Sequence, residues 1–257
     1  MSNEQCSPAP AYSPGVLILV FGDSDSEGAM TGGVAWPAML VDRVSAAGLP
    51  EVTLEAVRFT AAPANAAAYV QRRLEQYGPD VVILPVGAWG FTSEFVEYRV
   101  RRLLGARAAR WYKHWENRFD HATRKRGAEP AGANRAGRGI LRRLVGTAPQ
   151  VTAEELATHY EDVFRILARF EDTRVLAMMY PGITRAALPP KVLAVRGRFC
   201  ARMRQAAESH RFSWLDPGEI FPADVPIRGF AADDLHFNAE GHRLIAEAMF
   251  AKLRPLV

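Results

Sequence analysis

The chain has 257 residues, 49% of them hydrophobic, and a formal net charge of +4. That length and composition suffice for one substantial hydrophobic core. Only two cysteines are present, Cys6 and Cys200, which excludes a disulfide framework and a cysteine-rich zinc site. The longest apolar runs are strand-length, which excludes a membrane span, and residues 1–13 lack the basic and apolar regions of a signal peptide. We therefore expect a cytoplasmic protein without metal, cofactor or membrane partner, with a disordered tail at 1–13 and a single domain at 14–257.

Strands and helices alternate along the chain. Continuous apolar runs predict buried strands, and apolar residues at helical spacing predict the helices between them. In chain order the predicted elements are a strand at 15–21, a helix at 36–47, a strand at 52–59, a helix at 64–77, a strand at 81–86, one or two helices across 93–126, a helix at 152–170, a strand at 174–179, a helix at 192–209, a strand at 212–215 and a helix at 239–252. This alternation predicts an α/β fold in three layers, α/β/α, with a five-stranded parallel sheet.

Positive charge is concentrated in one part of the chain. Between Arg99 and Arg143, twelve arginines and two lysines stand against three carboxylates, a net charge of +11, which leaves −7 for the rest. Residues 127–139 are rich in Ala, Gly and Arg and have no apolar period, so they predict a mobile loop. We therefore expect a basic insertion at 99–150 that forms a helical lid and this loop.

Polar side chains follow the first and the last predicted strands. Ser24 follows the first strand, and Asp233 and His236 lie between the fifth strand and the final helix. Because ligands collect beyond the carboxyl ends of parallel strands, we expect these residues to meet there. A serine hydroxyl becomes a nucleophile when an imidazole removes its proton, and a carboxylate fixes that imidazole. Ser24, His236 and Asp233 are therefore a candidate triad, with Asp234, two residues before His236, the less suitable carboxylate.

These residues lie in two motifs. Residues 21–24, Phe-Gly-Asp-Ser, resemble the first block of the SGNH hydrolase (GDSL-type esterase/lipase) family. Residues 233–242, Asp-Asp-Leu-His-Phe-Asn-Ala-Glu-Gly-His, resemble its last block, Asp-x-x-His-Pro-Asn-x-x-Gly-His. The resemblance extends from the first strand to the final helix, apart from the basic insertion. It implies a flavodoxin-like sheet, with Ser24 as nucleophile, His236 as base and Asp233 as the residue that orients the base.

Two blocks that supply oxyanion donors in that family are altered. In place of the second-block Gly, the chain has Thr60, Ala61 and Ala62, whose backbone N–H groups are candidate donors. In place of Gly-x-Asn in the third block, it has Gly87, an alanine and Trp89, so the amide donor is missing. The Trp89 indole N–H is one replacement, and a pocket wall is the other interpretation. Loss of one donor typically lowers turnover by about 10²–10³-fold, so we expect a weak enzyme or a substitute donor.

Other polar residues of the two motifs have structural interpretations. We expect Asp23 and Asp25 to hold the Ser24 turn by hydrogen bonds from side chain to backbone rather than to bind a metal, since no further carboxylates cluster with them in sequence. We expect His242 to pack or cap at the start of the final helix.

The basic insertion has two interpretations. One is a solvated helix face. The other is an electropositive lid that binds an anionic substrate through Arg99, Arg101 and Arg102, with Trp111 as a stacking surface. Coenzyme A, an acidic acyl carrier protein or a sugar nucleotide would fit this charge. No nucleic-acid-binding motif is present, so we expect no nucleic-acid partner.

Together these features predict a serine-dependent acyl-ester enzyme, an esterase or an acyltransferase, that works through an acyl-enzyme intermediate. The expected substrate is a small-molecule ester or thioester, either a small metabolite or an anionic acyl donor. The alternative is a catalytically impaired module of the same fold that binds an anionic ligand.

Overall fold

The computed structural model describes residues 15–28, 31–124, 146–180, 189–221, 227–232 and 236–256. The chain divides into two compact units, which we describe separately: Met1–Ala88 with Glu154–Val257, and Trp89–Ala153. The insertion expected at 99–150 falls within the second unit. The tail expected at 1–13 and the loop expected at 127–139 lie outside the described residues.

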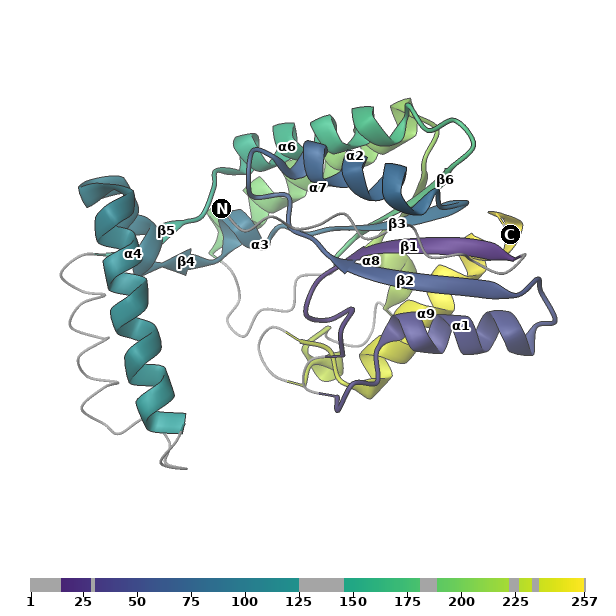
Figure 1. Cartoon of the computed structure of the whole chain (residues 1–257), viewed down its shortest axis with the longest axis horizontal. Helices are drawn as coiled ribbons and strands as arrows, with labels where there is room; N and C mark the ends of the chain where they lie inside the picture. The colour runs from purple at the N-terminus through teal and green to yellow at the C-terminus, as the bar shows by residue number, and fades with distance from the viewer. Residues whose placement is uncertain are drawn as a thin grey trace. The chain divides into compact units, whose positions relative to one another are not determined.

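The first unit is built on a five-stranded sheet whose order is β2-β1-β3-β6-β7 (Figure 1). Every neighbouring pair in this sheet is parallel. The strands are β1 (Val16–Gly22), β2 (Val52–Arg58), β3 (Val81–Val86), β6 (Arg174–Met179) and β7 (Ser213–Leu215). This order is the flavodoxin-like one, so the predicted fold class and the five-stranded parallel sheet are confirmed.

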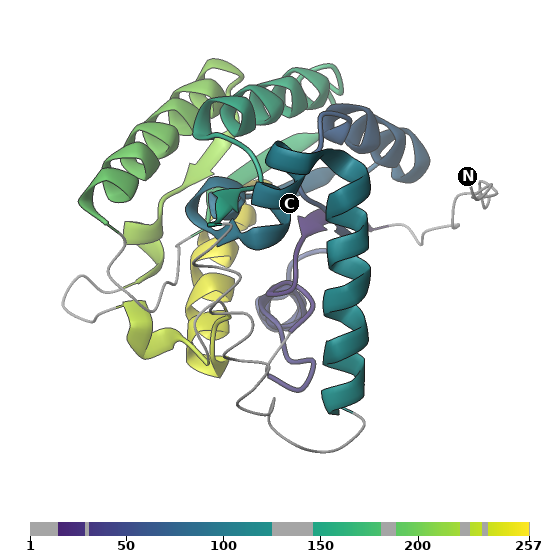
Figure 2. The same ribbon diagram turned by 90° about the vertical axis from the view of Figure 1, so that its left-hand side faces the viewer.

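Helices cover both faces of the sheet, as the two views in Figures 1 and 2 show. One face carries α1 (Trp36–Ala46) and α9 (Ala239–Leu253), and the other carries α2 (Ala66–Tyr77), α6 (Ala153–Leu167) and α7 (Pro190–Ser209). The short helix α8 (Pro217–Ile220) and the 3₁₀ turns Ile227–Phe230 and Arg254–Leu256 belong to the same unit. The predicted three-layer arrangement is confirmed.

The two central strands determine where the candidate site lies. All six residues of β3 are buried, and so are six of the seven in β1. Strands covered on both faces need apolar residues at every position, which explains why their sequences do not alternate. The chain leaves β1 through α1 on one face and reaches β3 through α2 on the other. The carboxyl ends of β1 and β3 therefore form the topological switch point, where flavodoxin-like folds bind ligands.

The second unit contains α3 (Trp89–Thr92), α4 (Val96–Arg124) and an antiparallel pair, β4 (Glu94–Phe95) and β5 (Ala148–Pro149). Gly105, with φ 83° and ψ 175°, divides α4 into two helical stretches, a conformation that glycine adopts readily. Val100, Ala109 and Tyr112 form a small buried cluster. In neither unit is any described helix both long and apolar enough to cross a bilayer.

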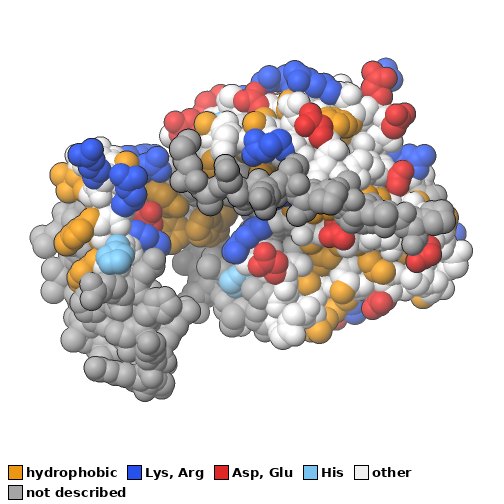
Figure 3. Space-filling model, in the orientation of Figure 1, with side chains coloured by type: hydrophobic (Ala, Val, Ile, Leu, Met, Phe, Trp, Pro, Cys, Tyr) orange, Lys and Arg blue, Asp and Glu red, His pale blue; other side chains and the backbone are white. Residues whose placement is uncertain are grey.

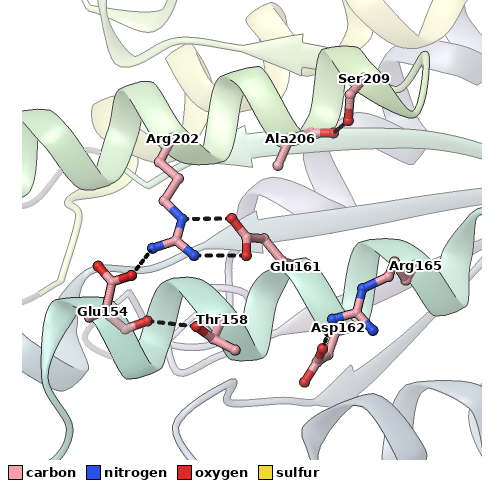
Figure 4. A network of polar contacts seen from close by, with 8 residues as sticks. All are labelled: Glu154, Thr158, Glu161, Asp162, Arg165, Arg202, Ala206 and Ser209. Atoms are coloured by element: carbon pink, nitrogen blue, oxygen red, sulfur yellow. Dashed lines mark hydrogen bonds and ion pairs between the residues drawn. The ribbon is translucent and has the colours of Figure 1, made fainter.

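Arg202 joins α7 to α6 (Figure 4). Its Nε and Nη2 atoms donate to the two carboxylate oxygens of Glu161 at 2.6 and 2.8 Å, and its Nη1 atom donates to Glu154. This hydrogen bond from Arg202 lowers the pKa of the Glu161 carboxyl below its ordinary value of 4.5. The Arg202 and Glu161 side chains are 33% and 31% exposed, so solvent screens part of their attraction.

Replacing Glu161 by Gln is expected to lower the free energy of unfolding at pH 7 by at most about 1 kcal/mol, the range for partly exposed ion pairs. Because the pKa of Glu161 is lower in the folded state, this stabilisation is complete above the unfolded value near 4.5 and is lost as the pH falls through the folded value. Urea unfolding of the wild type and the variant at pH 7 and at low pH measures this difference in the free energy of unfolding. Glu208→Gln, at an exposed i,i+4 pair with Arg204, is the control and should have a smaller effect. A Glu161→Gln effect that is the same at both pH values would contradict the assignment.

Candidate active site

Ser24 lies on a tight turn directly after β1. Asp23 holds this turn, because its Oδ1 atom accepts hydrogen bonds from the backbone N–H groups of Asp25 at 3.1 Å and Ser26 at 3.4 Å. Burial raises the pKa of the Asp23 carboxyl above its ordinary value of 3.8, although these hydrogen bonds act in the opposite direction. The predicted role of Asp23 is confirmed.

Gly22 is required at the start of this turn for steric reasons. A Cβ atom at this position would lie 2.5 Å from the Cβ atom of Ser26, closer than real Cβ contacts allow. The carbonyl of Gly22 also accepts a hydrogen bond of 2.8 Å from the N–H of Phe59, which follows β2. The turn that carries Ser24 is thus packed against itself and joined to the neighbouring strand end.

His236 lies on a loop that is fastened on both sides. Before it, the N–H of Ala232 donates to the His236 carbonyl at 2.8 Å, and Ala231 pairs with Phe237 in an antiparallel bridge. After it, Phe237 is fully buried in the core. Asn238 then caps α9, since its Oδ1 atom accepts from the N–H of Gly241 at 2.9 Å. These contacts hold the backbone at His236 and Phe237.

The structure brings Ser24 and His236 together. The His236 Nε2 atom lies 3.1 Å from the Ser24 Oγ atom, across 212 positions of sequence. This is hydrogen-bond distance, and it is the contact through which an imidazole removes a serine proton. Both residues are half-buried. Asp233 lies outside the described residues, so its role stays a prediction.

Two backbone donors lie at the carboxyl ends of adjacent strands. Ser24 follows β1, and Ala61 follows β2, where the hydrogen bond between Phe59 and Gly22 joins the two chain segments. Within the described part of the chain, neither the Ser24 N–H nor the Ala61 N–H donates a hydrogen bond. The Ala62 N–H, in contrast, donates to the Thr60 Oγ1 atom at 3.4 Å. Of the three predicted second-block donors, Ala62 is thus engaged within its own loop, whereas Thr60 and Ala61 donate no N–H hydrogen bond among the described residues.

Two neighbouring residues on α6 support the loops around the site. His159 Nδ1 lies 2.9 Å from the Ala61 carbonyl oxygen, which can only accept, so this nitrogen carries the proton. The buried Tyr160 hydroxyl accepts from the Gly87 N–H at 2.9 Å, and burial raises its pKa. The Gly87 N–H therefore donates a structural hydrogen bond. Sequence reasoning missed both α6 residues, because their helical spacing gives no sign of the loops that they contact.

Asp25 has a different partner from the one expected. Its Oδ1 atom accepts a hydrogen bond of 3.0 Å from the N–H of Phe237, which is 212 positions away, and the residue is 5% exposed. The prediction that it holds its own turn by side-chain hydrogen bonds did not include this long-range partner. Asp23 accepts from the N–H groups of Asp25 and Ser26, and the Asp25 carboxylate reaches across to the other loop.

His242 is a packing residue, as predicted. It is fully buried on the first turns of α9, and its ring lies 6.1 Å from that of Phe237 in an edge-to-face arrangement. Burial lowers the pKa of its imidazole below 6.5, and the charge of His236 acts in the same direction. Both effects favour the neutral form of the side chain.

The remaining predicted residues belong to the second unit. Trp89 is 46% exposed, and its ring lies 5.2 Å from that of Phe95. Arg99, Arg101 and Arg102 are all exposed, and Arg102 donates to the Pro149 carbonyl at 3.3 Å. Trp111 is 71% exposed. Their contribution to a site stays a prediction.

Three of the solved structures with a similar fold are esterases. The Clostridium thermocellum family 3 carbohydrate esterase is 15% identical, with a TM-score of 0.52 over 94% of this chain and 96% of that chain. Est24, a carbohydrate acetylesterase from Sinorhizobium meliloti, is 12% identical, with a TM-score of 0.53 over 94% and 100%. The aryl esterase of M. smegmatis is 14% identical, with a TM-score of 0.51 over 94% and 100%. At these identities the likeness concerns the fold.

No curated protein matches the sequence. A family description does match, over residues 20–244, which include both the Ser24 turn and the His236 loop. The chain therefore belongs to the GDSL-like lipase/acylhydrolase family and is an ester-hydrolysing enzyme.

Proposed function

We propose that the chain cleaves small acyl esters or thioesters through a triad of Ser24, His236 and Asp233 and an acyl-enzyme intermediate. The contact of 3.1 Å between the Ser24 Oγ atom and the His236 Nε2 atom is the observation that carries this proposal. Asp233 stands three residues before His236, a spacing that suits a carboxylate that accepts from the Nδ1–H group and fixes the tautomer.

In the first half-reaction, the Ser24 Oγ atom attacks the carbonyl carbon while its proton passes to His236 Nε2. The new bond between oxygen and carbon gives a tetrahedral oxyanion. When this collapses, the bond to the leaving group breaks, and the leaving oxygen or sulfur takes the proton from His236. The acyl group remains on Ser24.

In the second half-reaction, an acceptor gives its proton to His236 and attacks the acyl carbon, and Ser24 leaves with that proton. Water as acceptor makes the enzyme a hydrolase, and an alcohol or amine makes it an acyltransferase. Hydrolysis is the outcome that family membership supports. Transfer requires a second substrate and a site that excludes water.

The oxyanion is assigned to the backbone N–H groups of Ser24 and Ala61. Both are free of other hydrogen bonds in the described residues, and both stand at the sheet edge where the carbonyl oxygen would lie. Backbone donors are fixed before the reaction begins, which is the property that makes an oxyanion hole effective. The His159 side chain holds the Ala61 carbonyl and so limits rotation of this loop. Two backbone donors would offset part of the loss of the third-block amide.

Ser24 is expected to take a covalent label from a fluorophosphonate probe, seen as a mass increase on the peptide that contains it. Ser24→Ala should take none, and His236→Ala and Asp233→Asn should label far more slowly, with losses of about 10³-fold or more in turnover of p-nitrophenyl acetate. Asp234→Asn is the matched control for Asp233 and should keep most activity. A folded wild-type protein that takes no label under conditions that label a control esterase would favour the impaired binding module.

Positioning of the oxyanion loop is tested at His159. Replacement by Ala removes the donor to the Ala61 carbonyl and is expected to lower kcat by roughly 10-fold with little change in KM, because small displacements of transition-state donors affect the chemical step. His159→Asn places an amide N–H near the position of Nδ1 and should restore most of the loss. Equal kcat values for the wild type and His159→Ala would contradict this role.

The second unit carries an exposed cationic surface, which the proposal assigns to substrate binding. Arg99, Arg101, Arg107 and Arg110 are exposed on α4 beside the exposed ring of Trp111. Figure 3 shows Lys, Arg and hydrophobic side chains gathered on the surface of this unit. Guanidinium groups pair with phosphate and carboxylate, and the indole offers a stacking face. We propose that this surface binds the anionic part of an acyl donor, with coenzyme A thioesters and an acidic acyl carrier protein as candidate donors.

The double variant Arg99→Glu/Arg101→Glu is expected to raise KM for an anionic acyl donor such as acetyl-coenzyme A by about 10-fold or more, since attraction becomes repulsion at two positions. KM for neutral p-nitrophenyl acetate should stay the same. Arg169→Glu, an exposed cation at the end of α6 on the opposite edge of the sheet, is the control and should change neither value. Equal effects of the double variant on both substrates would refute a role in anion binding.

A further inference from the structure

We propose that Asp25 is a positioning residue, which holds the His236 loop in register with the Ser24 turn by accepting the N–H of Phe237. This inference rests on the proposed function, because it assigns Asp25 a part in the reaction of Ser24. Asp25 does not contact the reacting atoms through this bond. It acts through the backbone that carries His236.

The two loops are joined by two parallel contacts between consecutive residues. Ser24 Oγ meets His236 Nε2 at 3.1 Å, and one position further along each loop Asp25 Oδ1 meets the Phe237 N–H at 3.0 Å. Each contact spans 212 positions of sequence. The first contact must change during catalysis, because a proton crosses it. The second involves no titrating nitrogen, so it can keep the loops aligned while the first one changes.

The residue at position 237 explains why an acceptor is needed. The family block that this segment resembles has Pro after the His, and proline carries no N–H. Phenylalanine keeps the N–H, and Phe237 is fully buried, with its ring packed against Phe221 and Tyr180. A buried N–H without an acceptor is destabilising, and a carboxylate is a strong acceptor for it. Asp25 satisfies that N–H in the buried interior and, by doing so, fixes the residue next to His236.

The neighbouring anchors of the loop determine which step of the reaction the loss of Asp25 would affect. Asn238 and Gly241 anchor the loop beyond Phe237, and Ala232 anchors it before His236. Loss of the Asp25 bond would therefore leave the loop folded, with the backbone between these anchors free to shift. A shift of the order of 1 Å at a catalytic base is sufficient to lower a rate by about 10²-fold. The expected defect is in the chemical step rather than in substrate binding.

The test compares Asp25→Asn with Asp25→Leu in the full-length protein. Asparagine keeps the Oδ1 acceptor without the charge, and leucine removes the acceptor at similar size. Asp25→Leu is expected to lower kcat for p-nitrophenyl acetate, and the rate of Ser24 phosphonylation, by about 10–10²-fold, with KM changed by less than about threefold. Asp25→Asn should recover most of both rates. If Asp25→Leu does not fold, Asp25→Ser takes its place, since its short side chain cannot reach Phe237.

Asp80 provides the matched control. Its carboxylate accepts the N–H of Leu17 at 2.8 Å, at the opposite edge of the same sheet. Asp80→Leu removes the same kind of bond and should lower thermal stability while leaving the phosphonylation rate of the folded protein unchanged.

Three results would overturn the proposal. The first is an Asp25→Leu protein that is less stable than wild type yet labels at the wild-type rate, which would make the bond merely structural. The second is an Asp25→Asn protein as slow as Asp25→Leu with a displaced pH–rate profile, which would assign the effect to charge. The third is a wild-type protein that takes no label on Ser24, which would overturn the proposed function and this inference together. If only the Asp25 inference fails, the wild-type protein still takes the label on Ser24. Failure of the inference is therefore distinguishable from failure of the proposed function.

Discussion

Burial of β1 on both faces of the sheet is the constraint on which the site depends. A strand whose residues are nearly all apolar is stable only between two other strands and beneath helices on each side. That position puts its last residue at the switch point between β1 and β3, where the following helices leave in opposite directions. Gly22 permits the sharp turn there, and Ser24 is presented at the open edge. The hydrophobic core thus places Ser24, the proposed nucleophile, at this edge of the sheet.

The other loops of the site are held by contacts from two different helices, α6 and α9. α6 supplies His159 to the loop after β2 and Tyr160 to the end of β3, so one rigid helix fixes two neighbouring loops. The capped start of α9 fixes the segment that carries His236. Precision at the centre therefore comes from helices that are themselves packed into the core, which is the arrangement that catalytic geometry requires.

Much of this structure was predictable from the sequence, for identifiable reasons. The strands β3 and β6 have the predicted bounds because their apolar runs end abruptly at Gly87 and Pro181. Ser24 and His236 were found because short motifs mark both loops. The strands β4 and β5 were missed because two residues cannot display a period. The long-range partner of Asp25 was missed because a carboxylate beside a turn has a sufficient local explanation, and only the tertiary structure brings Phe237 to it.

The distance in sequence between the two halves of the site has a consequence for synthesis. Ser24 and the first strands emerge from the ribosome before His236, which lies 212 positions later, and before α9. A growing chain therefore carries the proposed nucleophile without its proposed base until position 236 has been made. α9 also packs beside α1 against the sheet, so its arrival closes the core and completes the reactive centre in one event. Reactivity in such a chain begins only when the whole fold is present.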